Sequence, residues 1–166
     1  MKLFLIGLPG SGKSTLGVAL ADRLSLPFFD LDDEIVANQN MPIPEIFEKY
    51  GEDFFRKAEK NALHHLVESE NSFVIATGGG TPCFFDNMDF INNNGKSIFL
   101  DVSPKEIADR LNKQETENRP LLGVVDNLQG KLEKLLENRV GFYKKAYLTV
   151  TAEMHVGDVI LTLKKY

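Results

Sequence analysis

The chain has very little cysteine, and Cys83 is the only one in its 166 residues. A single thiol cannot form an intramolecular disulfide and cannot build a cysteine-based metal cluster. Such a chain fits a reducing compartment, so we expect a cytoplasmic protein. A catalytic thiol is disfavoured, because an isolated cysteine more often serves as a small buried apolar residue.

The chain also lacks an excess of positive charge and a long hydrophobic run. Its net charge of -5 argues against a nucleic-acid-binding surface, although a few arginines can still form a pocket for a small anion. No stretch is long enough to span a membrane, and the apolar segment before Gly7 is too short for a signal peptide. We therefore expect no nucleic-acid partner and no membrane, and a single domain over residues 1–166.

The most specific feature present is the stretch G-L-P-G-S-G-K-S at residues 7–14, which fits the phosphate-binding pattern G-x-x-x-x-G-K-[ST]. An unbroken apolar run precedes it and apolar residues at helical spacing follow it, so the loop joins a buried strand to a helix. Backbone N–H groups and the helix dipole favour an anion there. We expect Lys13 to contact nucleotide phosphates and the Ser14 hydroxyl to bind Mg²⁺. A plain strand-to-helix turn with a surface lysine is the alternative, and the agreement of the motif and both flanks disfavours it.

Further short apolar segments alternate with stretches of helical periodicity. The predicted strands are residues 3–6, 28–29, 73–76, 97–100 and 148–151. The predicted helices are residues 13–24, 45–50, 52–69, 84–91, 104–111, 128–144 and 156–166, with a further short one around Ile35. This alternation predicts an α/β fold, a five-stranded parallel sheet covered on both faces. Its strands should end at one edge, where Gly and Asp residues indicate the active site.

Two acidic residues, Asp30 and Asp32, follow the second predicted strand. If the strand stays extended, both side chains point the same way. One can then hold water around Mg²⁺, and the other can accept a proton from a substrate hydroxyl. The alternatives are solvated turn residues, or a helix N-cap at Asp32.

Three arginines are weaker candidates taken one at a time, whereas a triple glycine is a stronger one. Arg56 and Arg139 lie on predicted helices, where a lone arginine is usually at the surface. Gly78–Gly80 follow a buried strand and present bare N–H groups, which suit a carboxylate or hydroxyls, although a tight turn is the alternative. Arg119 lies in the polar, aperiodic segment 112–126, where it could reach a transferred phosphoryl group or simply face solvent.

Taken together, these segments resemble the shikimate kinases over essentially the whole chain. The resemblance rests on residues 7–15 (GLPGSGKST), 30–32 (DLD), 51–56 (GEDFFR), 76–80 (ATGGG) and 119–122 (RPLL), and on Arg139 followed by Tyr143. It implies a P-loop NTPase fold of three α/β/α layers with strand order 2-3-1-4-5. It also implies MgATP-dependent phosphorylation of the 3-hydroxyl of shikimate in aromatic amino-acid biosynthesis. We expect a monomer, with a substrate-binding region at about 32–60 and a lid at about 112–124.

The resemblance also implies a role for each matching residue. The ATP-binding residues would be Gly10, Ser11, Gly12, Lys13, Ser14, Thr15, Arg110 and Arg119. The shikimate-binding residues would be Asp32, Phe47, Phe55, Arg56, Gly78, Gly79, Gly80 and Arg139. Lys13, Asp32 and Arg119 would be catalytic, with Asp32 as the base, and Ser14 and Asp30 would serve Mg²⁺. Val156 departs from the proline that some relatives place beside adenine.

Two other functions compete with this one. A related kinase of gluconate or of a nucleoside monophosphate would share the phosphate loop. A nucleotide-dependent switch domain would share it too, but a GTPase of that kind should carry the guanine motif Asn/Thr-Lys-x-Asp, which the sequence lacks.

Overall fold

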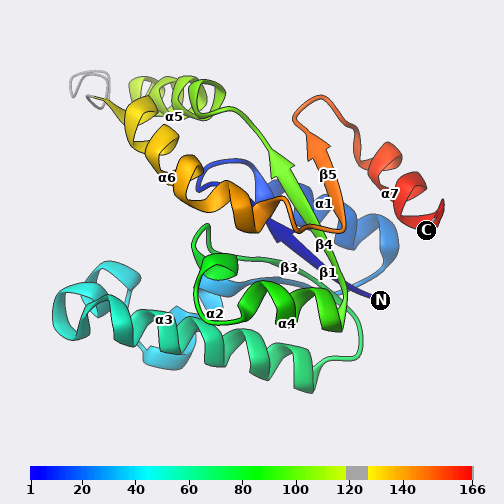
Figure 1. The fold of residues 1–166 in the computed structure, drawn as a ribbon, viewed down its shortest axis with the longest axis horizontal. Coiled ribbons are helices and arrows are strands. Elements are labelled where there is room, and N and C mark those ends of the chain that lie inside the picture. Colours follow the sequence, from blue (N-terminus) through cyan, green and yellow to red (C-terminus); the bar gives the residue numbers. More distant parts are fainter. Residues whose placement is uncertain (119–126, 166) are drawn as a thin grey trace.

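The computed structural model describes residues 1–118 and 127–165, which form a parallel sheet between helical layers (Figure 1). The sheet has five strands in the order β2-β3-β1-β4-β5. The strands are β1 (Lys2–Ile6), β2 (Phe28–Asp30), β3 (Phe73–Ala76), β4 (Lys96–Asp101) and β5 (Leu148–Thr151). The predicted α/β class, the parallel pairing and the strand order are confirmed.

Helices connect the strands and cover both faces of the sheet. They are α1 (Lys13–Leu24), α2 (Leu31–Gln39), α3 (Ile43–Ser69), the 3₁₀ turn η1 (Thr81–Cys83), α4 (Asn87–Asn94), α5 (Pro104–Asn118), α6 (Leu128–Tyr143) and α7 (Val156–Lys165). In the part of the chain that the structure describes, no helix has the length and apolar character needed to cross a membrane.

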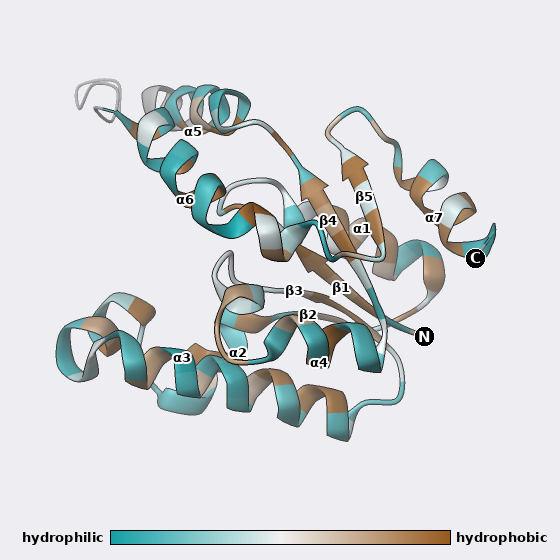
Figure 2. Ribbon diagram, in the orientation of Figure 1, coloured by the Kyte–Doolittle hydropathy of each residue, from teal (hydrophilic) through white to brown (hydrophobic). Residues whose placement is uncertain are grey.

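Strand β1 shows how the sequence forms the core. Leu3 and Leu5 pack in one cluster with α1 and α7, whereas Phe4 packs in another with α2, α3 and α4. Successive side chains of a strand point to opposite faces, so an unbroken apolar run requires burial on both. Figure 2 accordingly shows hydrophobic residues along the strands and hydrophilic residues on the outer sides of the helices.

A third apolar cluster lies at the carboxyl ends of the strands. It joins Ile6 of β1 and Phe99 of β4 to residues of α5 and α6, including Tyr143. This cluster anchors α5 and α6 beside the edge of the sheet where the phosphate loop begins.

The two helices predicted at 45–50 and 52–69 both lie within α3, and the break predicted at Gly51 is confirmed, because Gly51 has non-helical angles (φ 79°, ψ 177°) that kink the helix there. Two other predicted helix boundaries need correction. The helix predicted at 84–91 is replaced by η1, extended Phe84 and α4, which starts at Asn87. Helix α5 continues to Asn118, because polar residues with good helix propensity need no apolar stripe on an outer helix.

The predicted lid therefore divides into two parts. Residues 112–118 belong to α5 and are helical, so the irregular conformation predicted for them is wrong. Residues 119–124, including Arg119, lie outside the described residues.

Candidate active site

The phosphate loop joins β1 to α1 as predicted. Gly10 and Gly12 have φ angles of 77° and 97°, a region that glycine enters without a steric cost. Gly12 is the N-cap of α1 and provides no side-chain hydrogen bond, so the first N–H groups of the helix remain open to an anion. The Ser11 hydroxyl is buried and has no hydrogen-bond partner within residues 1–118 and 127–165.

Lys13 lies inside this loop and is buried. Its Nζ donates to the carbonyl oxygens of Gly7 at 3.1 Å and Leu8 at 2.8 Å. Burial lowers the pKa of Lys13 to about 8, although the charges of Asp32 and Asp30 partly oppose this. The ammonium is therefore held at the loop, and it loses its proton at a lower pH than an ordinary lysine does.

A cleft of about 440 Å³ opens beside the loop. Ten of the predicted site residues line it: Gly10, Gly12, Lys13, Ser14, Thr15, Asp30, Asp32, Gly78, Gly79 and Arg110. They come from the phosphate loop, α1, the β2–α2 junction, the loop after β3, and α5. The structure thus brings predicted nucleotide and metal residues to one edge of the sheet, together with Asp32, Gly78 and Gly79 of the predicted substrate residues. The other predicted substrate residues do not line this cleft: Phe47, Phe55, Arg56, Gly80 and Arg139.

A second hollow, of about 290 Å³, adjoins the cleft and shares Gly12 and Thr15 with it. Its walls are mainly apolar and include Leu16 and Val156. A hollow of this kind suits the flat base of a nucleotide. Arg110 lines the larger cleft and donates to Glu106 at 2.5 Å, so its predicted contact with adenine stays a prediction.

Asp30 and Asp32 face the cleft, but not from an extended strand. Strand β2 ends at Asp30, which caps α2: its Oδ1 accepts from the Asp32 N–H at 3.1 Å. Its Oδ2 accepts from the Ser14 hydroxyl at 2.7 Å. The extended geometry predicted for this pair is wrong, and the N-cap is Asp30 instead of Asp32.

The two carboxylates have different surroundings, which suit them to different roles. Burial raises the pKa of Asp32, and the nearby charges of Asp30 and Glu59 raise it further, against an opposing effect of Lys13. A raised pKa makes the Asp32 carboxylate a stronger base. Asp30 is held by hydrogen bonds beside Ser14, where two hard oxygen atoms lie together.

Arg56 of α3 is buried, and its guanidinium lies against Gly80. It donates to Glu59 at 2.9 Å and to Glu52 at 3.3 Å. Its guanidinium lies 5.1 Å from the ring of Phe55 and 4.1 Å from the ring of Phe84. The two aromatic rings and the two carboxylates together hold the guanidinium in a fixed orientation.

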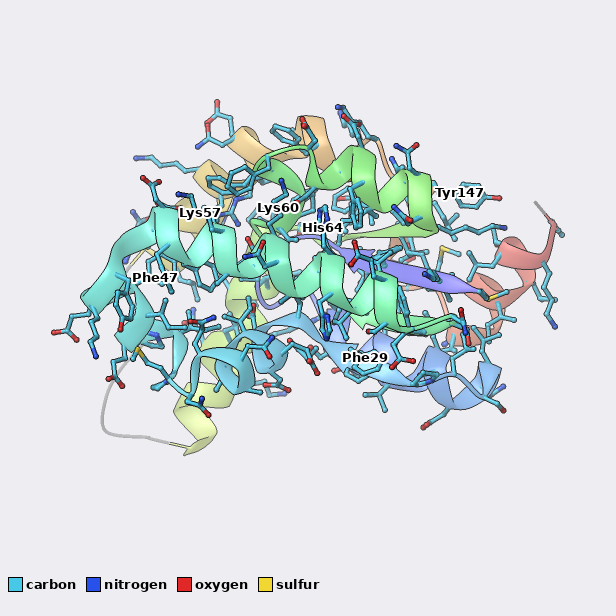
Figure 3. The ribbon with its side chains drawn as sticks, turned by 90° about the horizontal axis from the view of Figure 1, so that it is seen from below. Phe29, Phe47, Lys57, Lys60, His64 and Tyr147 are labelled. Atoms are coloured by element: carbon cyan, nitrogen blue, oxygen red, sulfur yellow. The ribbon has the colours of Figure 1, made fainter. Side chains whose placement is uncertain are left out.

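Phe47 packs on this cluster from the N-terminal part of α3 (Figure 3). Its ring centroid lies 4.6 Å from that of Phe55, and its side chain is partly exposed. The two predicted apolar residues therefore lie together and beside Arg56.

Sequence reasoning missed Glu59, which is fully buried. It accepts from Thr81 at 2.5 Å as well as from Arg56, so it ties α3 to η1. A Cβ at Gly78 would lie 2.7 Å from Glu59 Oε1 and 3.2 Å from Asp32 Oδ1. The available signal was a carboxylate between Phe55 and Leu63 on the apolar side of a helix, where a charge requires a partner.

The triple glycine is required by close packing. A Cβ at Gly79 would lie 2.7 Å from Pro9 of the phosphate loop, and one at Gly80 would lie 2.6 Å from Arg56 Nη1. This loop therefore connects the phosphate-binding loop to Arg56.

Arg139 lies on α6 and is half-buried. Its positive charge contributes to lowering the pKa of Lys13 and opposes the burial that raises the pKa of Tyr143, which places its charge within reach of both groups. Burial raises the pKa of Cys83 to about 11, so its thiol stays protonated and a nucleophilic role is disfavoured.

A family model described as shikimate kinase matches residues 9–162. The chain belongs to the shikimate kinase family. A shikimate kinase of Bacteroides fragilis is 44% identical over 147 residues, which are 88% of this chain and 82% of that protein.

Solved shikimate kinases show the same fold. The enzyme of Bacteroides thetaiotaomicron superposes with a TM-score of 0.85 at 38% identity, over 99% of this chain and 97% of its own. The enzyme of Acinetobacter baumannii, solved in complex with shikimate, gives 0.81 at 33% identity, over 99% and 90% of the two chains.

Proposed function

We propose that this protein transfers the γ-phosphoryl group of ATP to the 3-hydroxyl of shikimate, giving shikimate 3-phosphate and ADP for aromatic amino-acid biosynthesis. One observation supports this above all: the glycine loop joins a phosphate-binding cleft to a buried guanidinium. Gly78 and Gly79 line the cleft with Lys13, while Gly80 packs against Arg56. Membership of the shikimate kinase family and the shikimate complex of a solved relative agree with it.

On the nucleotide side, the backbone of residues 10–15 holds the phosphates and Lys13 exchanges its carbonyl partners for phosphate oxygens. Ser14 and Asp30 offer hard oxygen atoms, the donors that Mg²⁺ prefers. No group of three His, Cys, Asp or Glu side chains in the described regions could hold a metal by itself, which agrees with an ion bound mainly through phosphates and water. When bound, Mg²⁺ neutralises charge on the phosphates.

On the substrate side, Arg56 and Arg139 bind the carboxylate of shikimate, with Phe47 and Phe55 against the ring. Two guanidinium groups fix a planar carboxylate and thereby decide which hydroxyl faces ATP. Asp32 accepts the proton of that hydroxyl, a role for which its raised pKa suits it.

Arg119 completes the proposal as a residue that stabilises the transferred phosphoryl group when the lid closes. We also propose that the protein acts as a monomer in the cytoplasm, and that Arg110 and the hollow beside Val156 receive the adenine.

An assay of ADP release tests the proposal. With ATP and Mg²⁺, shikimate should stimulate ADP release strongly, whereas gluconate and AMP should leave it near the basal rate. Omission of Mg²⁺ should abolish the stimulation. Equal stimulation by gluconate or AMP would favour the related kinases, and nucleotide binding without stimulation by any of the three would favour a switch domain.

A further inference from the structure

Tyr143, the last residue of α6, is fully buried and yet makes a polar contact with the glycine loop. Its hydroxyl donates to the Gly79 carbonyl at 2.5 Å. Its ring packs on Phe99 with a centroid distance of 5.1 Å. Burial raises the pKa of Tyr143 to about 12, so the hydroxyl remains a donor throughout the pH range in which enzymes of this kind work.

This hydrogen bond fixes the direction of the Gly79 carbonyl, and the Gly79 carbonyl in turn fixes the direction of the Gly80 N–H. The Gly79–Gly80 peptide bond is trans and planar, so its carbonyl and its N–H point to opposite sides. Fixing the Gly79 carbonyl toward Tyr143 therefore turns the Gly80 N–H away from α6. Among residues 1–118 and 127–165, neither the Gly79 nor the Gly80 N–H donates to a protein acceptor. Gly79 lines the cleft, and Gly80 is buried next to it.

The peptide that Tyr143 fixes lies between the two halves of the site. Gly79 packs on Pro9 of the phosphate loop, and Gly80 packs on the Arg56 guanidinium. Glycine has no side chain to hold such a peptide in place, and three in succession leave the backbone with unusual freedom. Tyr143 supplies the missing restraint from outside the loop.

The same helix also carries Arg139, one turn before Tyr143. Residues four apart lie on one face of a helix, and the charge of Arg139 acts on the Tyr143 hydroxyl. The hydrogen bond to Gly79 thus fixes α6, and with it Arg139, relative to the loop.

We infer that Tyr143 is a positioning residue for shikimate: its hydroxyl orients the Gly79–Gly80 peptide and sets the distance from the glycine loop to Arg139. This inference rests on the proposed function. It assigns to Tyr143 a role in substrate affinity beyond its place in the apolar core.

The test is Tyr143→Phe, which removes the hydroxyl and keeps the ring. We expect KM for shikimate to rise about tenfold, equivalent to about 1.4 kcal/mol, and KM for ATP to stay within twofold. Tyr147→Phe is the matched control: Tyr147 is exposed and lies at the opposite end of the molecule from Phe47 in Figure 3. It should behave as the wild type.

A second control tests whether Tyr143 has only a structural role. Leu132→Ala removes a buried side chain from the same helix and should lower Tm without raising KM for shikimate. In the unliganded proteins, the Gly80 amide resonance should shift in Tyr143→Phe and not in Tyr147→Phe.

Two failures are distinguishable. If the wild type does not phosphorylate shikimate, the proposed function is wrong. If the wild type does so and Tyr143→Phe retains its KM for shikimate and its Gly80 resonance, the inference about Tyr143 is wrong.

Discussion

The two sides of the cleft are built in different ways. The nucleotide side comes from one continuous stretch, residues 7–15, and presents mainly backbone groups and the N-terminus of α1. The substrate side is assembled from α3, the loop after β3, η1 and α6, and depends on bonds between side chains such as Glu59–Arg56 and Glu59–Thr81.

This difference has a mechanical consequence. Backbone donors keep their positions as long as the strand–loop–helix unit is intact, so single side chains there matter mainly where they touch the phosphates. On the substrate side, each side chain also positions another. Substitutions there should be strongly coupled, because removal of one partner leaves a buried charge unpaired.

The largest effect is expected where the two sides meet, at Asp32. Asp32→Asn removes the proposed base while keeping the shape, and kcat should fall by about 10²–10⁴-fold. In the wild type, activity should fall as the pH drops through the raised pKa of Asp32, at a higher pH than for an ordinary aspartate. The variant should lack this acid limb in its pH–rate profile.

Asp33→Asn is the matched control, since Asp33 is exposed and adjacent in sequence. It should keep kcat and retain an acid limb, moved slightly to lower pH because the charge of Asp33 also contributes to raising the pKa of Asp32. A kcat of Asp32→Asn within tenfold of the wild type would remove Asp32 from the role of base.

The same contrast explains what sequence reasoning could reach. The fold was predictable because each strand is an apolar run followed by a helical period, and the phosphate loop because its pattern is contiguous. Asp30 and Asp32 were located, but not their geometry, because the point where β2 becomes α2 depends on Asp30 capping the helix, a hydrogen bond that alternation does not reveal.

Glu59, Thr81 and Tyr143 were harder, because their importance comes from contacts across the chain. Glu59 meets Thr81 22 positions away, and Tyr143 meets Gly79 64 positions away. The end of α5 was predicted too early because residues 112–118 lack an apolar stripe, although several of them favour a helix by intrinsic propensity.

A smaller effect is expected from Arg56→Ala. It should weaken shikimate binding by about 2–5 kcal/mol, because a buried charge-assisted contact is lost and Glu59 is left unpaired. The affinity for ATP should change little. Calorimetric titration with each ligand measures both.

A double-mutant cycle tests whether Arg56 and Glu59 act together. Glu59→Gln removes the charge beneath Arg56, so the double variant should differ from the sum of the single variants by about 0.5–3 kcal/mol. Lys57→Ala, at an exposed position of the same helix, is the control and should leave shikimate binding intact. Additive effects of Arg56 and Glu59 would contradict the coupled construction of this side.

The smallest effect concerns pH and separates the two sides directly. Lys13 has a pKa of about 8 in the unliganded protein, because burial disfavours its charged form. As the pH rises through this value, Nζ loses its proton and with it the attraction for phosphates. At pH 9 only about a tenth of the molecules would carry the charge, so the affinity for ATP should fall about tenfold between pH 7 and pH 9.

Bound phosphate stabilises the ammonium, so calorimetry near pH 8 should show proton uptake on ATP binding. The proposed contacts to shikimate involve no lysine, so the affinity for shikimate should stay constant. An ATP affinity that is equally constant from pH 7 to pH 9 would show that Lys13 keeps its proton in the free protein and that the two sides do not differ in this respect.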